Sequence, residues 1–98
     1  MINASISFQV LPLGLKENDA VKIIDKVIKM VQKSGINYHV GPMETTMEGD
    51  LEKMLDIIKN SQKLCTKSGA KTIFTNVKII YNPKGILSVK QKLSKYNK

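Results

Sequence analysis

The stretch from residue 38 to residue 50 concentrates side chains that could do chemistry. It holds His39, which is the only histidine of the chain, the carboxylates Glu44 and Glu48, and the adjacent Thr45 and Thr46. In an extended strand the two glutamates would share a face, as a general acid–base pair requires, although solvated acids are the commoner case. No second His and no Cys stands at ligand spacing from the histidine, so a surface or interface role is favoured over metal binding.

Other signatures of catalysis are missing from the sequence. There is no glycine-rich phosphate loop and no paired cysteine motif, and a single histidine offers no Ser-His-Asp set. Cys65 falls on the predicted apolar face of a helix, where a small core residue is more common than a nucleophile. These observations favour a binding protein over an enzyme, with no catalytic residues, no metal and no cofactor beyond a bound ligand.

Composition predicts one basic domain spanning residues 1–98. The chain has 16 basic residues against 8 acids, a net charge of +8, and all 16 are lysine. Such a balance admits anionic partners, but lysine lacks the guanidinium fork that reads guanine, and the lysines are spread along the chain. We therefore expect a solvated lysine surface and no specific nucleic-acid partner.

Cysteine count and hydropathy bear on the compartment. The single cysteine cannot form an intrachain disulfide. No basic-then-apolar leader precedes the first predicted strand, and no apolar run approaches the roughly 20 residues of a membrane span. The sequence predicts a cytoplasmic protein without a membrane partner.

The first half of the chain reads as strand, helix, strand. Alternation over residues 2–11 predicts a half-buried strand. Helical spacing follows as far as Lys33, with Asn18 or Asp19 as the expected cap at its start. Residues 36–40 then predict a short strand.

The second half repeats this plan. Residues 43–48 predict a strand, a helix follows from the cap Asp50 to Lys67, and residues 72–80 predict another strand. Lys-Ser-Gly follows both helices. The order βαββαβ is typical of the ferredoxin-like α+β fold, with a four-stranded antiparallel sheet and both helices on one face. A short amphipathic helix is expected near residues 86–93.

The uncovered sheet face is expected to be polar and mostly neutral. Alternation assigns it Ser5, Ser7, Gln9, Asn37, His39, Glu44, Thr46, Glu48, Thr72, Phe74, Asn76 and Lys78. We interpret it as a face closed by a partner sheet, with room for a flat polar ligand, while an ordinary solvated face is nearly as compatible. Phe74 or Tyr38 could stack on a ligand ring, although packing is the commoner use of an aromatic side chain. The methionines at positions 43, 47 and 54 are expected to fill the core.

Four segments carry a family resemblance. They are residues 4–14 (ASISFQVLPLG), 34–38 (SGINY), 41–49 (GPMETTMEG) and Gly69. Over residues 2 to about 80 the chain resembles the small thiamine-binding proteins with a ferredoxin-like fold, formerly a family of unknown function. The resemblance implies binding of thiamine or its hydroxymethylpyrimidine half, no catalysis, and assembly into dimers or tetramers through sheet faces.

The resemblance also implies ligand contacts. By position these are Thr45 and Glu48, with Ser7 and Gln9 on the adjoining strand, and the polar face adds Thr46, Phe74 and Asn76. Alternation puts Thr45 on the helix-covered face, so either a bulge turns it outward or it is structural and Thr46 faces the ligand. Glu44 stands where relatives often carry a small residue.

Two other functions remain open at this level. One is a structural or regulatory oligomer without a small ligand. The other is a weak nucleic-acid-binding domain, which would need two or three exposed rings on the sheet, where only Phe74 qualifies clearly.

Overall fold

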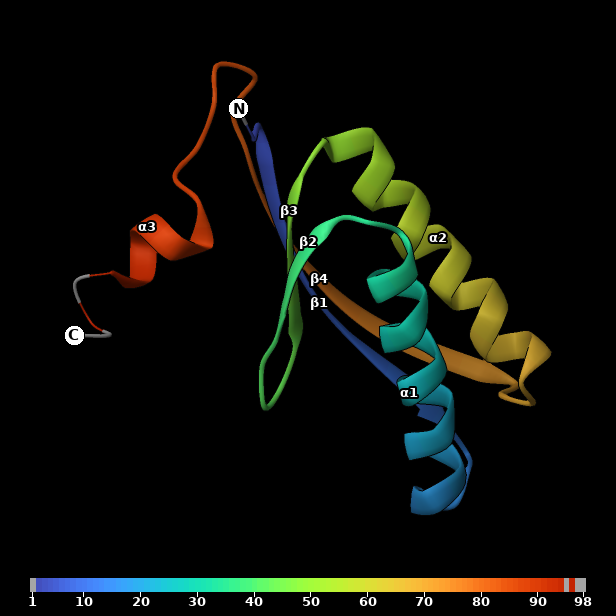
Figure 1. Ribbon diagram of the computed structural model, residues 1–98. Helices are drawn as coiled ribbons and strands as arrows, with labels where there is room; N and C mark the ends of the chain where they lie inside the picture. The colour runs from blue at the N-terminus through green and yellow to red at the C-terminus, as the bar shows by residue number, and fades with distance from the viewer. Residues whose placement is uncertain (1, 95, 97–98) are drawn as a thin grey trace.

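The computed structural model describes residues 2–94 and 96 and confirms the βαββαβ order, followed by a short helix (Figure 1). The other positions of the predicted domain, 1, 95 and 97–98, lie outside the described residues. The strands are β1 (Ala4–Leu13), β2 (Asn37–Val40), β3 (Thr45–Gly49) and β4 (Thr72–Tyr81). The helices are α1 (Glu17–Lys33), α2 (Leu51–Lys67) and α3 (Val89–Leu93).

The strands form one antiparallel sheet in the order β2-β3-β1-β4. Both long helices cover one face of this sheet, as predicted, and α3 lies on the other side (Figure 1). We call this second side the open face. Strand β1 is central, so its side chains decide what each face presents.

The core lies between the sheet and the two long helices. Alternate residues of β1 point into it, and Ile6 and Phe8 are almost fully buried. Met47 of β3 also lies in the core, as do Met54 and Cys65 of α2. None of these three residues has exposed surface. The alternation of β1 and the core role of these two methionines and of the cysteine are therefore confirmed.

Of the two long helices, α2 has a side-chain cap at its N-terminus and α1 has none. Asp50 caps α2 as predicted, and its carboxylate accepts a hydrogen bond of 3.0 Å from the backbone N–H of Lys53. The predicted cap of α1 at Asn18 or Asp19 is wrong, because α1 already begins at Glu17 and no side chain caps it. Two acids in its first turn suit the helix dipole instead.

Strand lengths differ from the prediction at one end of the sheet. Strand β3 begins at Thr45, so its pairing with β1 runs only from Ala4↔Gly49 to Phe8↔Thr45. On its other edge β1 pairs with β4 as far as Leu13↔Thr72. Beyond Phe8, β1 therefore has a strand partner on one edge only.

The shorter β3 also overturns the expectation for Met43. Because the strand starts two residues later, Met43 belongs to the β2–β3 connection and is 75% exposed. It does not fill the core.

Cys65 gives a test of the core. Burial raises the pKa of its thiol, which reduces the reactive thiolate at neutral pH. We expect slow labelling by a chromogenic disulfide reagent in the native protein and complete labelling after denaturation. The raised pKa also means that stability falls as pH rises past the ordinary thiol range. Rapid labelling of the native protein would contradict this packing.

Candidate functional site

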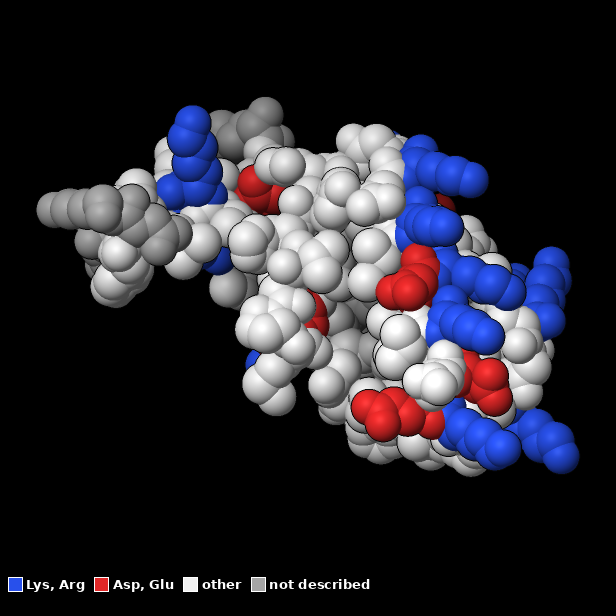
Figure 2. Space-filling view, turned by 60° about the horizontal axis from the view of Figure 1, so that its bottom comes forward, with Lys and Arg blue, Asp and Glu red and all other residues white. Residues whose placement is uncertain are grey.

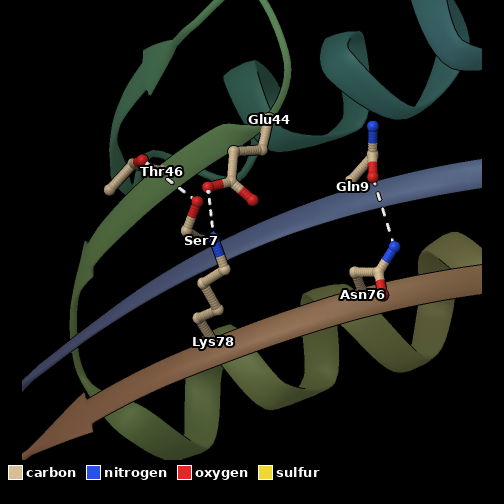
Figure 3. Close-up of polar contacts among 6 residues, drawn as sticks. All are labelled: Ser7, Gln9, Glu44, Thr46, Asn76 and Lys78. Atoms are coloured by element: carbon tan, nitrogen blue, oxygen red, sulfur yellow. Dashed lines mark hydrogen bonds and ion pairs between the residues drawn. The ribbon is translucent and has the colours of Figure 1, made fainter.

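Polar side chains meet in the middle of the open face (Figure 3). The Thr46 hydroxyl donates to Ser7 Oγ at 3.4 Å, joining β3 to β1. Asn76 Nδ2 donates to Gln9 Oε1 at 3.2 Å, joining β4 to β1. Four of the predicted site residues are therefore in contact in pairs across three strands.

An ion pair borders this group. Lys78 Nζ lies 3.2 Å from Glu44 Oε1, and the lysine side chain is largely exposed. Glu44 precedes β3, yet its carboxylate reaches the open face, where alternation placed it. An exposed pair of this kind adds at most about 1 kcal/mol to stability.

Glu48 lies toward the opposite end of the same face and is almost fully enclosed. The residue is 6% exposed, and its cross-strand neighbours are Ser5 and Asn37. Oε1 accepts a hydrogen bond of 2.6 Å from Asn37 Nδ2, and Oε2 accepts one of 2.7 Å from the backbone N–H of Val89. These donors offset part of the cost of burying a carboxylate.

A hollow of about 280 Å³ adjoins this carboxylate. We call it the polar cleft, and it is lined by Asn37, Tyr38, His39, Thr46, Glu48, Val89 and Lys90. A carboxylate has about four lone-pair sites, so Glu48 can accept further hydrogen bonds after its two internal ones. The cleft can therefore hold a ligand that carries a donor or a positive charge.

The contribution of α3 to this cleft was missed at the level of sequence. Ser88 and Gln91 form a capping box, with hydrogen bonds of 3.1 and 2.8 Å, and this box is recognisable as Ser-x-x-Gln. No residue of α3 is buried. Its approach to the sheet is fixed by the Val89–Glu48 contact and, upstream, by a backbone hydrogen bond from Ile86 to Ile2.

Thr45 lies on the opposite side of the sheet from Thr46. It pairs with Phe8, and the register of β1 with β3 is continuous, so there is no bulge between these strands. Thr45 is 9% exposed. Of the two alternatives left open by the sequence, the structure has Thr46 on the open face and Thr45 facing the helices.

Phe74 is on the open face but away from Glu48. It pairs with Leu11, whereas Glu48 pairs with Ser5, six residues earlier on β1. At roughly 3.3 Å per residue the two positions lie about 20 Å apart along the strand. The structure thus brings together the residues around Ser7 and leaves Thr45 and Phe74 apart from Glu48.

Charge is distributed unevenly over the surface. Figure 2 shows a row of blue basic side chains along the helical side, with acids among them, and a smaller basic group at the opposite end of the molecule. On α1 these are Lys22, Lys26, Lys29 and Lys33, all exposed. The predicted solvated lysine surface is thus found on the helices.

The described part of the chain shows neither a metal-binding cluster nor a membrane-spanning helix. Within residues 2–94 and 96, no three His, Cys, Asp or Glu side chains are grouped to hold a metal ion. None of the helices in the described part of the chain is long and apolar enough to cross a membrane.

Comparison with known proteins assigns the family. The model of the family described as "Thiamine-binding protein" matches residues 6–97, nearly the whole chain. This chain belongs to the thiamine-binding protein family. The resemblance based on the four sequence segments is confirmed.

Individual relatives agree with this assignment. A UPF0045 protein of Clostridium perfringens is 38% identical over 96 residues, covering 98% of this chain and 99% of the relative. The solved structure of a domain of unknown function, DUF77, from Bacillus cereus is 40% identical with a TM-score of 0.88, covering 97% of this chain and 90% of that one.

A third relative is a solved structure from Thermotoga maritima. The crystal structure of a Thermotoga maritima protein, described there with a proposed role in thiamine biosynthesis or salvage, is 29% identical with a TM-score of 0.86. The match covers 97% of the present chain and 99% of the Thermotoga maritima chain. The ferredoxin-like fold is thus shared with solved relatives.

The Val89–Glu48 contact can be tested through stability. Val89→Pro removes the donating N–H, and proline is favoured at the first position of a helix, so α3 itself should persist. We expect a loss of about 1–3 kcal/mol in the free energy of unfolding, because a buried carboxylate loses a donor. Denaturant unfolding measures it.

The matched control is Val89→Ala, which shortens the side chain and keeps the N–H. Equal stability of the two variants would show that the contact contributes nothing. Faster amide exchange over α3 in the proline variant alone would support it.

Proposed function

We propose that this family member binds thiamine, or its hydroxymethylpyrimidine half, without catalysis, in the polar cleft on the open face. The observation that carries the proposal is Glu48, a carboxylate 6% exposed at the edge of a hollow. A buried acid beside a cleft is suited to a ligand that brings a positive charge or a hydrogen-bond donor.

Thiamine has the chemistry that this cleft requires. It carries a fixed positive charge on one ring and an amino group on the other. Glu48 can accept from the amino group or offset the charge, and the hydroxyl of Thr46 and the amide of Asn37 can serve the ring nitrogens. Tyr38 pairs with the core residue Met47 and so projects to the helix-covered side, whereas His39 pairs with Thr46 and offers its ring on the open face beside the cleft. The name of the family and the proposed role of the Thermotoga maritima relative support the same ligand class.

The rest of the open face extends the proposed site. Ser7 contacts Thr46 at the boundary of the cleft, and Gln9 and Asn76 continue the polar surface toward β4. Their amides and hydroxyl are neutral and can donate or accept, so they can adjust to different substituents. Within this proposal they select the part of the ligand that extends beyond the cleft.

The ligand assignment is tested by two matched substitutions. Glu48→Gln and Glu44→Gln each remove one acid, so the net charge changes equally. We expect Glu48→Gln to weaken thiamine binding about tenfold to a hundredfold through the loss of a charge-assisted hydrogen bond, and Glu44→Gln to have little effect. Calorimetric titration with thiamine, its phosphates and the free pyrimidine measures both.

Stability must be followed in parallel, because Glu48 also accepts from α3. Titrations are therefore run where unfolding curves show both variants fully folded. Equal affinities of the two variants would refute the site. The absence of heat with every thiamine compound in the wild type would refute the function.

We also propose that the protein is a homo-oligomer, at least a dimer, with tetramers formed through sheet faces. Strand β4 is at the edge of the sheet, is ten residues long, and exposes Ile79, Ile80 and Tyr81. An apolar edge strand of this length favours pairing with another copy.

Self-association is tested by Ile80→Lys, which places a charge on the edge strand. We expect the wild type to show an oligomer mass by light scattering at micromolar concentration, and the variant a smaller mass. Val21→Lys, at a similarly exposed apolar position on α1, is the control and should keep the wild-type mass. A monomeric wild type would contradict the proposal.

A further inference from the structure

A second hollow, of about 360 Å³, lies between the two long helices on the helical side of the molecule. We call it the helix groove, and it is lined by Lys26, Lys29, Met30 and Lys33 of α1 and by Leu64 of α2. We propose that the helix groove is a docking site for an acidic amphipathic helix of a partner protein. The partner inserts an apolar side chain between α1 and α2 and sets its acids against the lysines.

The floor of the groove is apolar. Met30 and Leu64 are half-buried and pack against the core from above. Lysine carries its charge at the end of a four-carbon stem, so the rim is apolar close to the helices and charged further out. Lys26 Nζ reaches across to α2 and lies 3.5 Å from Ser68 Oγ. The groove can therefore receive an apolar side chain while it presents charge to the residues on either side of it.

The lysines of α1 form a row. Lys22, Lys26, Lys29 and Lys33 follow one another at intervals of four, three and four residues, and all four are exposed. Such intervals place side chains on one side of a helix. At 1.5 Å per residue the row is about 16 Å long. A helix laid beside it can carry acids at the same intervals, and this complementarity would fix its register.

The charge of this row is not neutralised within the chain. The described residues form two ion pairs, Lys59–Asp56 at 3.4 Å and Lys78–Glu44 at 3.2 Å, and neither uses a lysine of the row. Acids lie nearby on the helical side (Figure 2), but none of those described is within ion-pair distance of the row. Like charges one turn apart on a helix repel each other. Acids from a partner would relieve this repulsion.

The helical side also stays free in the proposed oligomer. Self-association there uses the sheet, whereas α1 and α2 turn their outer sides away from it (Figure 1). A second copy of this chain is a poor occupant of the groove, because two lysine rows would face each other. A different protein with an acidic helix fits the charge better.

Two other anionic partners would use the lysines without the floor. A lipid bilayer and a nucleic-acid backbone both attract lysine. Neither places an apolar side chain between the two helices, so neither makes use of the recess at Met30 and Leu64. The experiment therefore measures the contributions of charge and of apolar insertion separately.

The charge is tested by fluorescence anisotropy with a labelled helical peptide of glutamate and alanine that carries leucine along one side. We expect binding at about 0.15 M salt. Replacing three lysines of the groove by glutamine should weaken it about tenfold, since each exposed charge pair contributes modestly. A control with the same net charge replaces three exposed lysines elsewhere and should bind as the wild type does. The groove variant is K26Q/K29Q/K33Q, and the control is K16Q/K71Q/K84Q.

Apolar insertion is tested on the wild-type protein with a second peptide, in which serine replaces each leucine. Its charge is the same, and we expect it to bind about tenfold more weakly because no apolar side chain is buried. Failure of the leucine peptide to bind, equal binding of the two peptides, or equal affinities of the two triple variants would overturn the proposal. Tighter binding of phosphatidylserine–phosphatidylcholine vesicles, or of a thymidine oligonucleotide, than of the leucine peptide would overturn it in favour of a membrane or a nucleic acid.

Discussion

The structure depends on a difference in length between two neighbouring strands. Strand β1 has ten residues, while β3, on one side of it, has five. The central strand is consequently paired on both edges only from Ala4 to Phe8. At the doubly paired end the first residue of α3 contacts the open face and a carboxylate is enclosed. At the other end one edge of β1 is unpaired, and a hollow of about 200 Å³ lies between α1, the end of β1 and the connection at residues 41–44.

At the enclosed end, the chemistry centres on the burial of Glu48. A charged carboxylate is expensive to remove from water unless donors replace the lost solvent. The protein provides one donor from β2 and one from the start of α3, which joins the C-terminal segment to the sheet. The same carboxylate adjoins the polar cleft, so the group that anchors α3 is also the group best placed to recognise a ligand. If thiamine binds as we propose, its binding and the docking of α3 are coupled through this one side chain.

Sequence patterns correctly predicted the features of the fold that depend on local periodicity and capping. The alternation of β1 located the open face correctly, with Ser7 and Gln9 on it, and the acid at position 50 marked the start of α2. Alternation also placed Thr45 against the helices, which the structure confirms. These features follow from the two-residue period of a strand and from capping chemistry, which neighbouring residues determine.

Contacts between distant segments could not be predicted in this way. The burial of Glu48 depends on Val89, 41 residues further along the chain. Met43 was expected in the core because its type suits it, yet the strand begins only at Thr45 and leaves it exposed. The unpaired edge of β1 results from the point at which its pairing with β3 ends, and no local pattern encodes that point.

The most direct measurement is a crystal structure of this protein grown with saturating thiamine. Our account predicts ligand density in the polar cleft, with a thiamine nitrogen or its amino group within hydrogen-bond distance of the Glu48 carboxylate and with Thr46 in contact. Density for thiamine elsewhere on the molecule, with the polar cleft empty, would contradict it.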